Sequence, residues 1–242
     1  MQSITYRDDA NSIMRDAKTG EIREAIRIAT EQERQSHTLR KIIESQIPML
    51  HEAIRLPKNN AADALLDFVL RYISHVPNFI DAIGGLTKEA GIYQYASIFL
   101  RIAEDFFIKP PEVIADHSGL EALLDEAYLA HRLIEEVNDR IIARYSIPLA
   151  PMDMTRANLI VHQLIGEPYA NQLDFAVFYS TEINLPDDKQ IDGEAFRRYV
   201  DVHKNRGWGV ELGRWPCLAE DLEIDVNFSN PTPSSKKSRL FH

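Results

Sequence analysis

Apolar residues recur at three- and four-residue steps along most of this chain, with polar residues between them, which is the period of an amphipathic α-helix. The clearest case lies between Ser118 and Tyr145, where Ser118 and Glu121 form a capping-box pattern that places a helix start at Gly119. Its apolar stripe is wide enough to pack against more than one neighbour. The stripe consists of Leu120, Leu123, Leu124, Ala127, Ala130, Ile134, Val137 and Ile141. We expect the other helices to assemble around this one.

Three further segments with helical periodicity precede it. The first runs from Thr19 to about Leu50 and should kink at Pro48, because proline lacks the amide donor that a helix interior needs. The second covers residues 61–83 and is followed by Gly84-Gly85, and the third runs from Thr87 to about Ile108. Short connections favour antiparallel neighbours, so these segments predict an antiparallel bundle of four core helices.

The part of the chain after Pro148 is less regular. A helix is expected from Asp153 to about Ile165, and another from Asp192 to about Asn205. Residues 173–185 fit the period of a strand and that of a helix, and we favour a helix because helical segments surround them. The sequence thus predicts an all-α fold with two or three C-terminal helices beside the bundle. Whether 149–206 forms its own subdomain is left open.

The two ends of the chain differ from the middle in composition. Residues 1–18 show no sustained period and are expected to form a loose arm, whereas 19–206 would form the helical bundle domain. Residues 207–242 read as an extended arm that carries Trp208 and Trp215, followed by a disordered tail rich in proline and serine. The tryptophans either pin this arm onto the bundle, which we favour, or form a docking motif for another protein.

Composition narrows the classes of function. The 242 residues have 45% hydrophobic content, which suits a packed globular core, and a formal net charge of −10. That charge argues against binding to nucleic acid or to an anionic membrane, so we expect a protein partner instead. Cys217 is the only cysteine, which excludes an intramolecular disulfide and a Cys-based zinc site. We find neither a signal peptide nor an apolar run long enough to span a membrane, and expect a cytoplasmic protein.

The sequence contains no phosphate-binding loop, nucleophile elbow or paired-cysteine motif. Counting residues from the predicted turns places His75, Tyr95, His131 and Glu135 at one height of the bundle. A transition metal held by His75, His131 and Glu135 is therefore one hypothesis, by analogy with two-histidine, one-carboxylate sites. The alternative, which the positions at the margins of the apolar stripes favour, is a pair of hydrogen-bonded core histidines.

Three functions follow from these patterns. The first is a non-catalytic protein-binding module or scaffold, with Trp208, Trp215, Tyr72, Tyr95 and Phe99 as candidate ligand- or partner-binding residues. The second is a metal-dependent, non-haem helical-bundle oxidase that uses the histidine and carboxylate layer. The third is a binder of a small apolar ligand held among aromatic residues of the bundle, which are Phe68, Tyr72, Phe99 and Phe106.

Overall fold

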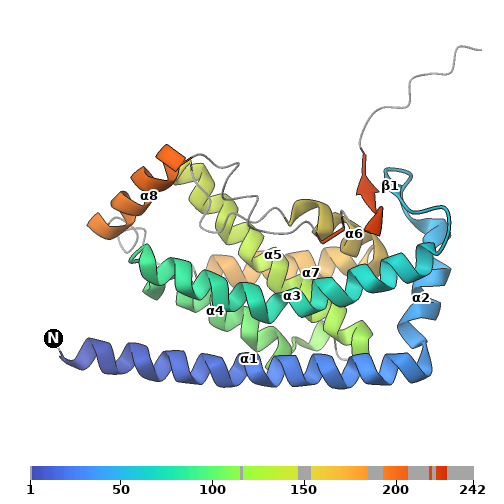
Figure 1. The fold of residues 1–242 in the computed structure, drawn as a ribbon, viewed down its shortest axis with the longest axis horizontal. Coiled ribbons are helices and arrows are strands. Elements are labelled where there is room, and N and C mark those ends of the chain that lie inside the picture. The colour runs from blue at the N-terminus through green and yellow to red at the C-terminus, as the bar shows by residue number, and fades with distance from the viewer. Residues whose placement is uncertain are drawn as a thin grey trace, which may run out of the picture.

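The computed structural model describes residues 2–114, 117–146, 154–184, 193–206, 218–219 and 222–227, and in these ranges it is almost wholly helical (Figure 1). The α-helices are α1 (Gln2–Ser36), α2 (Thr38–Gln46), α3 (Ala61–Glu89), α4 (Tyr93–Ile108), α5 (Gly119–Tyr145), α6 (Thr155–Ile165), α7 (Tyr169–Ile183) and α8 (Glu194–Arg206). Two 3₁₀ turns, η1 (Ile47–Met49) and η2 (Glu112–Ile114), and two short strands, β1 (Ile54–Arg55) and β2 (Asp225–Val226), complete them. The predicted all-α class is confirmed.

The helices α1, α3, α4 and α5 form the bundle, with α5 at its centre. In Figure 1, α1 lies along the lower edge, α2 turns upward at its end, and α3 returns above α1. Helix α5 crosses the molecule and packs against α1, α3, α4, α6 and α7. Apolar side chains of all these helices belong to one core, so α6 and α7 extend the bundle.

The predicted start of α5 at Gly119 is confirmed, although its cap differs from the expected one. Ser118 precedes the helix in an extended conformation, but its hydroxyl makes no capping hydrogen bond. The breadth of the apolar stripe explains the central place of α5, since most residues from Leu120 to Ile141 are buried. Burial on several sides, rather than the cap, therefore fixes this helix.

Helix α1 begins at Gln2, so the structure differs from the expected loose arm over 1–18. The segment has no proline and contains several good helix formers, which allows a helix to extend without an apolar period. The helix then breaks at His37, which adopts a left-handed conformation with φ of 53°. The carboxylate of Glu33 accepts the backbone amides of Leu39 (2.9 Å) and Arg40 (3.0 Å), so a side chain of α1 caps α2.

The boundary between α3 and α4 lies later than predicted. Gly84-Gly85 does not end α3, which continues to Glu89, and Thr87, the predicted start of the next helix, lies inside α3 with its hydroxyl bonded back to the carbonyls of Ile83 and Gly84. The end comes at Gly91, whose φ is 70°. There the amide of Ile92 bonds to the carbonyl of Thr87 and that of Gly91 to Lys88, which is a Schellman motif.

After α5, the described residues add the helices α6, α7 and α8 and the strand β2, which pairs with β1. Residues 173–183 are helical, which confirms the helix favoured for them, and they belong to α7. In the antiparallel pair of strands, Ile54 lies opposite Val226, so the C-terminal region returns to the loop after η1. Asp153, Asp192, Trp208 and Trp215 lie outside the described residues. No helix within the described ranges is long and apolar enough to span a membrane.

Candidate functional site

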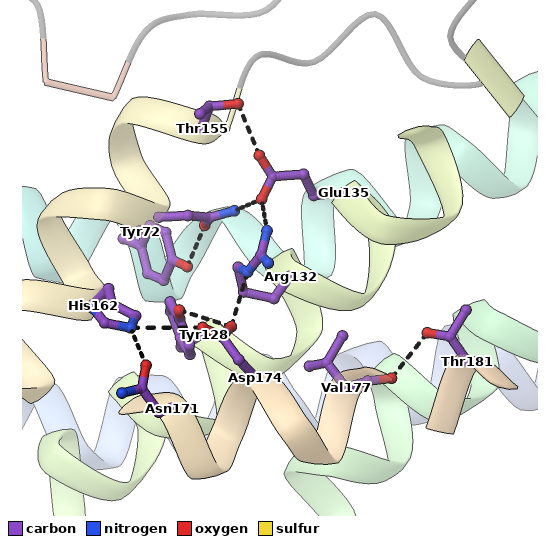
Figure 2. A network of polar contacts seen from close by, with 11 residues as sticks. Tyr72, Tyr128, Arg132, Glu135, Thr155, His162, Asn171, Asp174, Val177 and Thr181 are labelled. Atoms are coloured by element: carbon purple, nitrogen blue, oxygen red, sulfur yellow. Dashed lines mark hydrogen bonds and ion pairs between the residues drawn. The ribbon is translucent and has the colours of Figure 1, made fainter. Parts of the chain in front are cut away.

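A set of polar side chains joins α5 to α3, α6 and α7, and we call it the Arg132 network. It consists of Tyr72, Tyr128, Arg132, Glu135, Thr155, Asn158 and Asp174. Arg132 lies at its centre and donates to Glu135 on its own helix and, from Nε, to Asp174 on α7 at 3.0 Å (Figure 2). One guanidinium thus holds two carboxylates and ties α7 to α5.

The carboxylate of Glu135 carries the network from α5 to α6 and α3. It accepts hydrogen bonds from the Thr155 hydroxyl at 2.8 Å and from the Asn158 amide at 2.7 Å. The carbonyl oxygen of Asn158 in turn accepts the phenolic hydrogen of Tyr72 at 2.7 Å. Every oxygen of Glu135 therefore has a donor, so the hydrogen-bonding capacity of this partly buried carboxylate is met within the protein.

The second carboxylate, that of Asp174, is shared in the same way. Besides Arg132, it accepts the Tyr128 hydroxyl at 3.0 Å, and it lies 3.6 Å from Nε2 of His162, which also donates to Asn171 at 3.2 Å. Burial raises the pKa of Tyr128, and Asp174 raises it further. Burial lowers the pKa of Arg132, but Glu135 and Asp174 outweigh it and the net shift is upward. The tyrosine thus stays neutral and the guanidinium charged.

A second ion pair fixes how α5 and α7 run relative to each other. Arg140 donates to Glu136 on its own helix and to Glu182 on α7 at 2.6 Å. Arg132 with Asp174 and Arg140 with Glu182 are each separated by 42 residues. The two helices therefore run parallel in one register, and α6 is the connection that makes this possible.

His75 and His131 meet in the core, beside the Arg132 network. Their rings are stacked with centroids 5.4 Å apart, and the His131 ring also lies 4.3 Å from that of Tyr72 and 4.7 Å from that of Phe79. Nε2 of His131 donates to the carbonyl of Tyr72 at 3.0 Å, which places its proton on that nitrogen. Burial lowers the pKa of His75 to about 4 and that of His131 well below 6.5, so both rings are neutral at pH 7.

The residues predicted to share a metal are only partly brought together. The two histidines stack, but Glu135 is engaged by Arg132, Thr155 and Asn158. Within the described ranges, no group of three or more histidine, cysteine, aspartate and glutamate side chains has the geometry to hold a metal ion. The structure shows two stacked rings, of which His131 bonds to the Tyr72 carbonyl, and the metal site and the pair of hydrogen-bonded core histidines both stay predictions.

The other predicted site residues lie in the core or outside the described chain. Tyr72, Tyr95 and Phe99 are buried, and the Tyr95 ring lies 5.5 Å from that of Phe99. Phe99 borders a cavity of about 10 Å³, with Ile83, Ala96, Leu100, Ile134, Val137 and Asn138 as its other lining residues. This volume suits about one water molecule, so the cavity does not offer a preformed place for an organic ligand.

Two buried carboxyl groups of α5, those of Asp125 and Glu126, were not predicted from the sequence. Nδ1 of His117 lies 2.5 Å from the Asp125 carboxylate, which also accepts the Tyr169 hydroxyl at 3.3 Å, and burial raises the pKa of Asp125 to about 6. The neighbouring Glu126 is only 6% exposed, and burial followed by the charge of Asp125 raises its pKa to about 8. Oε2 of Glu126 has no hydrogen-bond partner within the described structure. No motif marks these residues, because their partners come from separate elements.

The outer face of α7 is unusual because it exposes large apolar side chains. Phe175, Phe178, Tyr179 and Ile183 are 68%, 52%, 58% and 64% exposed, and we call these four residues the α7 stripe. At 100° per residue they fall within roughly 140° of one side of the helix. The opposite side carries Leu173 and Val177, which are buried, and Asp174 lies on the flank between Phe178 and Val177, where it binds Arg132. Helix α7 is therefore apolar on both sides, and this explains why its sequence period was ambiguous.

The Arg132 network and the α7 stripe differ in their chemistry. In the Arg132 network each carboxylate already has donors, and the hydrogen bonds join α5 to α3, α6 and α7. The α7 stripe has unburied apolar surface on a helix that is held firmly from behind. Comparisons of this chain with protein-family models, with curated proteins and with solved structures found no match.

Proposed function

We propose that this protein is a non-catalytic protein-binding module that presents the α7 stripe to another chain. The observation that carries the proposal is the exposure of four large apolar side chains, each more than half exposed, on one face of a single helix. Single exposed apolar residues are common on soluble proteins, but a contiguous set at helical spacing is typical of an interaction surface.

The support behind α7 strengthens the proposal. Leu173 and Val177 are buried beneath the helix, and Arg132 and Arg140 bind its two carboxylates from α5. A surface held in this way loses little conformational freedom when a partner binds, so more of the interaction energy contributes to affinity. The aromatic members of the stripe add large contact area at low entropic cost.

Site-specific photo-crosslinking tests the proposal. A photoreactive phenylalanine analogue at position 178 should give a discrete protein adduct, whereas the same analogue at Ile28, which is 44% exposed on α1, should not. The partner identified by mass spectrometry would then be purified and titrated against the protein. We expect Phe175→Ser to weaken its affinity at least about tenfold. Equal affinity of the wild-type and the Phe175→Ser proteins would refute a role of the stripe in binding.

A further inference from the structure

The charges around the α7 stripe indicate what its partner looks like. Helix α7 contains two acidic residues, Asp174 and Glu182, and no lysine, arginine or histidine. Each of these carboxylates shares its arginine with a glutamate of α5, since Arg132 also binds Glu135 and Arg140 also binds Glu136. The border between α5 and α7 therefore has more negative than positive groups.

Asp139 adds to this excess. It is exposed on α5 beside Arg140. Burial raises the pKa of Asp139, the negative charges of Glu135 and Glu136 raise it further, and Arg132 lowers it, so Asp139 lies close enough to these three groups to feel their charges. With Asp139 included, five carboxylates (residues 135, 136, 139, 174 and 182) face two guanidiniums (residues 132 and 140), a formal charge of −3.

The shape of the stripe favours a helix as its occupant. The backbone of α7 is satisfied within the helix, so it offers no donors or acceptors to an added strand. A partner helix satisfies its own backbone and can pack its apolar side chains between those of α7 at about 8–10 Å between axes. From Phe175 to Ile183 the stripe rises about 12 Å, which matches roughly two turns of such a helix.

From these observations we infer that the α7 stripe binds a basic amphipathic helix of another protein, with its apolar face on Phe175 and Phe178 and its lysines or arginines along the acidic border. This inference rests on the proposed function. A second copy of this chain fits less well, because each copy has a net charge of −10 and brings the same acidic border. Anionic lipid is disfavoured for the same reason.

Synthetic helices test the charge requirement directly. Three fluorescent 18-residue peptides would share one face of leucine and phenylalanine and carry lysine, glutamine or glutamate on the other face. We expect the lysine peptide to bind the full-length protein at least about tenfold more tightly than the glutamate peptide in fluorescence anisotropy, and this preference to shrink in high salt.

Variants assign the binding to α7 and its border. Phe175→Ser with Phe178→Ser should abolish binding of the lysine peptide, whereas Met49→Ser, which alters an apolar side chain 66% exposed on another element, should leave it unchanged. Glu182→Gln with Asp139→Asn should weaken the lysine peptide and leave the glutamine peptide unaffected. Circular dichroism and thermal unfolding would establish that each variant is folded.

The possible failures are distinguishable. If all three peptides bind alike and the Phe175 and Phe178 variant abolishes binding, the stripe is a docking surface but the partner need not be basic, and this inference is wrong. If no peptide binds, or if binding ignores the stripe, both this inference and the role proposed for α7 fail. Two further results would overturn the inference. These are concentration-dependent dimerisation that Phe178→Ser abolishes, and tighter binding to phosphatidylcholine vesicles than to the lysine peptide.

Discussion

Helices α5 and α7 run side by side in one register, yet they use polar and apolar residues in opposite ways. Helix α5 buries charged and polar groups such as Asp125, Glu126 and His131, whereas α7 leaves Phe175 and Phe178 in solvent. In α5 most of the polar groups find partners inside the protein, whereas the four residues of the α7 stripe each keep more than half of their surface exposed. The contrast separates a helix that holds the fold together from one that presents a surface.

Matched truncations of an apolar side chain on each helix would test this contrast with the largest effect. Leu133 of α5 is fully buried, so Leu133→Ala should lower the free energy of unfolding by about 3 kcal/mol through lost burial and a residual cavity. Phe178→Ala on α7 should change it by less than about 0.5 kcal/mol, because the ring is half exposed. Urea denaturation measures both, and comparable losses would show that the stripe is packed.

Removing the Arg132 guanidinium, which joins α5 to α7, should have the next largest effect on the free energy of unfolding. Arg132→Ala leaves the partly buried carboxylates of Glu135 and Asp174 without their shared cation, and should cost about 2–3 kcal/mol. Arg34→Ala is the control, because its pair with Glu31 is largely exposed and should contribute little. Equal stabilities of the two variants in urea would show that the Arg132 network does not join the helices.

Glu126→Gln should stabilise the protein at alkaline pH. The unfolded carboxyl ionises near 4.5, but the folded one keeps its proton up to a pKa of about 8. The contribution of the protonated Glu126 to the free energy of unfolding is therefore fully present below about pH 4.5, and it is lost as the pH rises through 8. Glutamine removes this loss, so we expect a gain on the order of 2 kcal/mol at pH 8 in thermal or urea unfolding. Glu89→Gln, at an exposed position, is the control variant measured under the same conditions.

The sequence predicted the helices well where apolar period alone defined them. The broad stripe from Leu120 to Ile141 identified α5 and its central place, because deep burial requires such a stripe. The N-terminus of α1 and the end of α3 were misjudged. The N-terminal part of α1 has no apolar period but is helical. At the end of α3 the sequence has Gly84-Gly85 and then Gly91, and only Gly91 has the left-handed conformation that ends a helix.

The candidate sites were harder to predict for a physical reason. Helix rise placed His75 and His131 at one height, and their rings do stack. The direction of the Glu135 side chain depends on Thr155 and Asn158 of α6, and the helical period does not show where α6 packs on α5. The α7 stripe shares its segment with buried Leu173 and Val177. Apolar residues therefore occur all around this helix, and the sequence does not reveal which side remains exposed.

His131→Gln should change how the free energy of unfolding varies at acidic pH. We expect this effect to be smaller than those of the other variants. Unfolded histidine takes up a proton near pH 6.5, whereas burial holds the folded pKa of His131 well below that value and that of His75 at about 4. The unfolded state therefore binds more protons between about pH 6.5 and 4, and stability falls as the pH falls through this window.

Each histidine changes the free energy of unfolding by at most about 1.4 kcal/mol per pH unit. The protonation of Glu126 changes this free energy in the opposite direction over part of the pH range. Glutamine can still donate to the Tyr72 carbonyl but does not titrate here. The stability of His131→Gln relative to wild type should therefore improve by about 1 kcal/mol per unit as the pH is lowered from 6.5 to 5. His37→Asn, at an exposed left-handed position, is the control variant measured over the same pH range. Parallel urea titrations across this range would measure both variants, and a constant difference between His131→Gln and wild type would mean that the folded and unfolded states bind protons at His131 equally, so that burial does not lower its pKa.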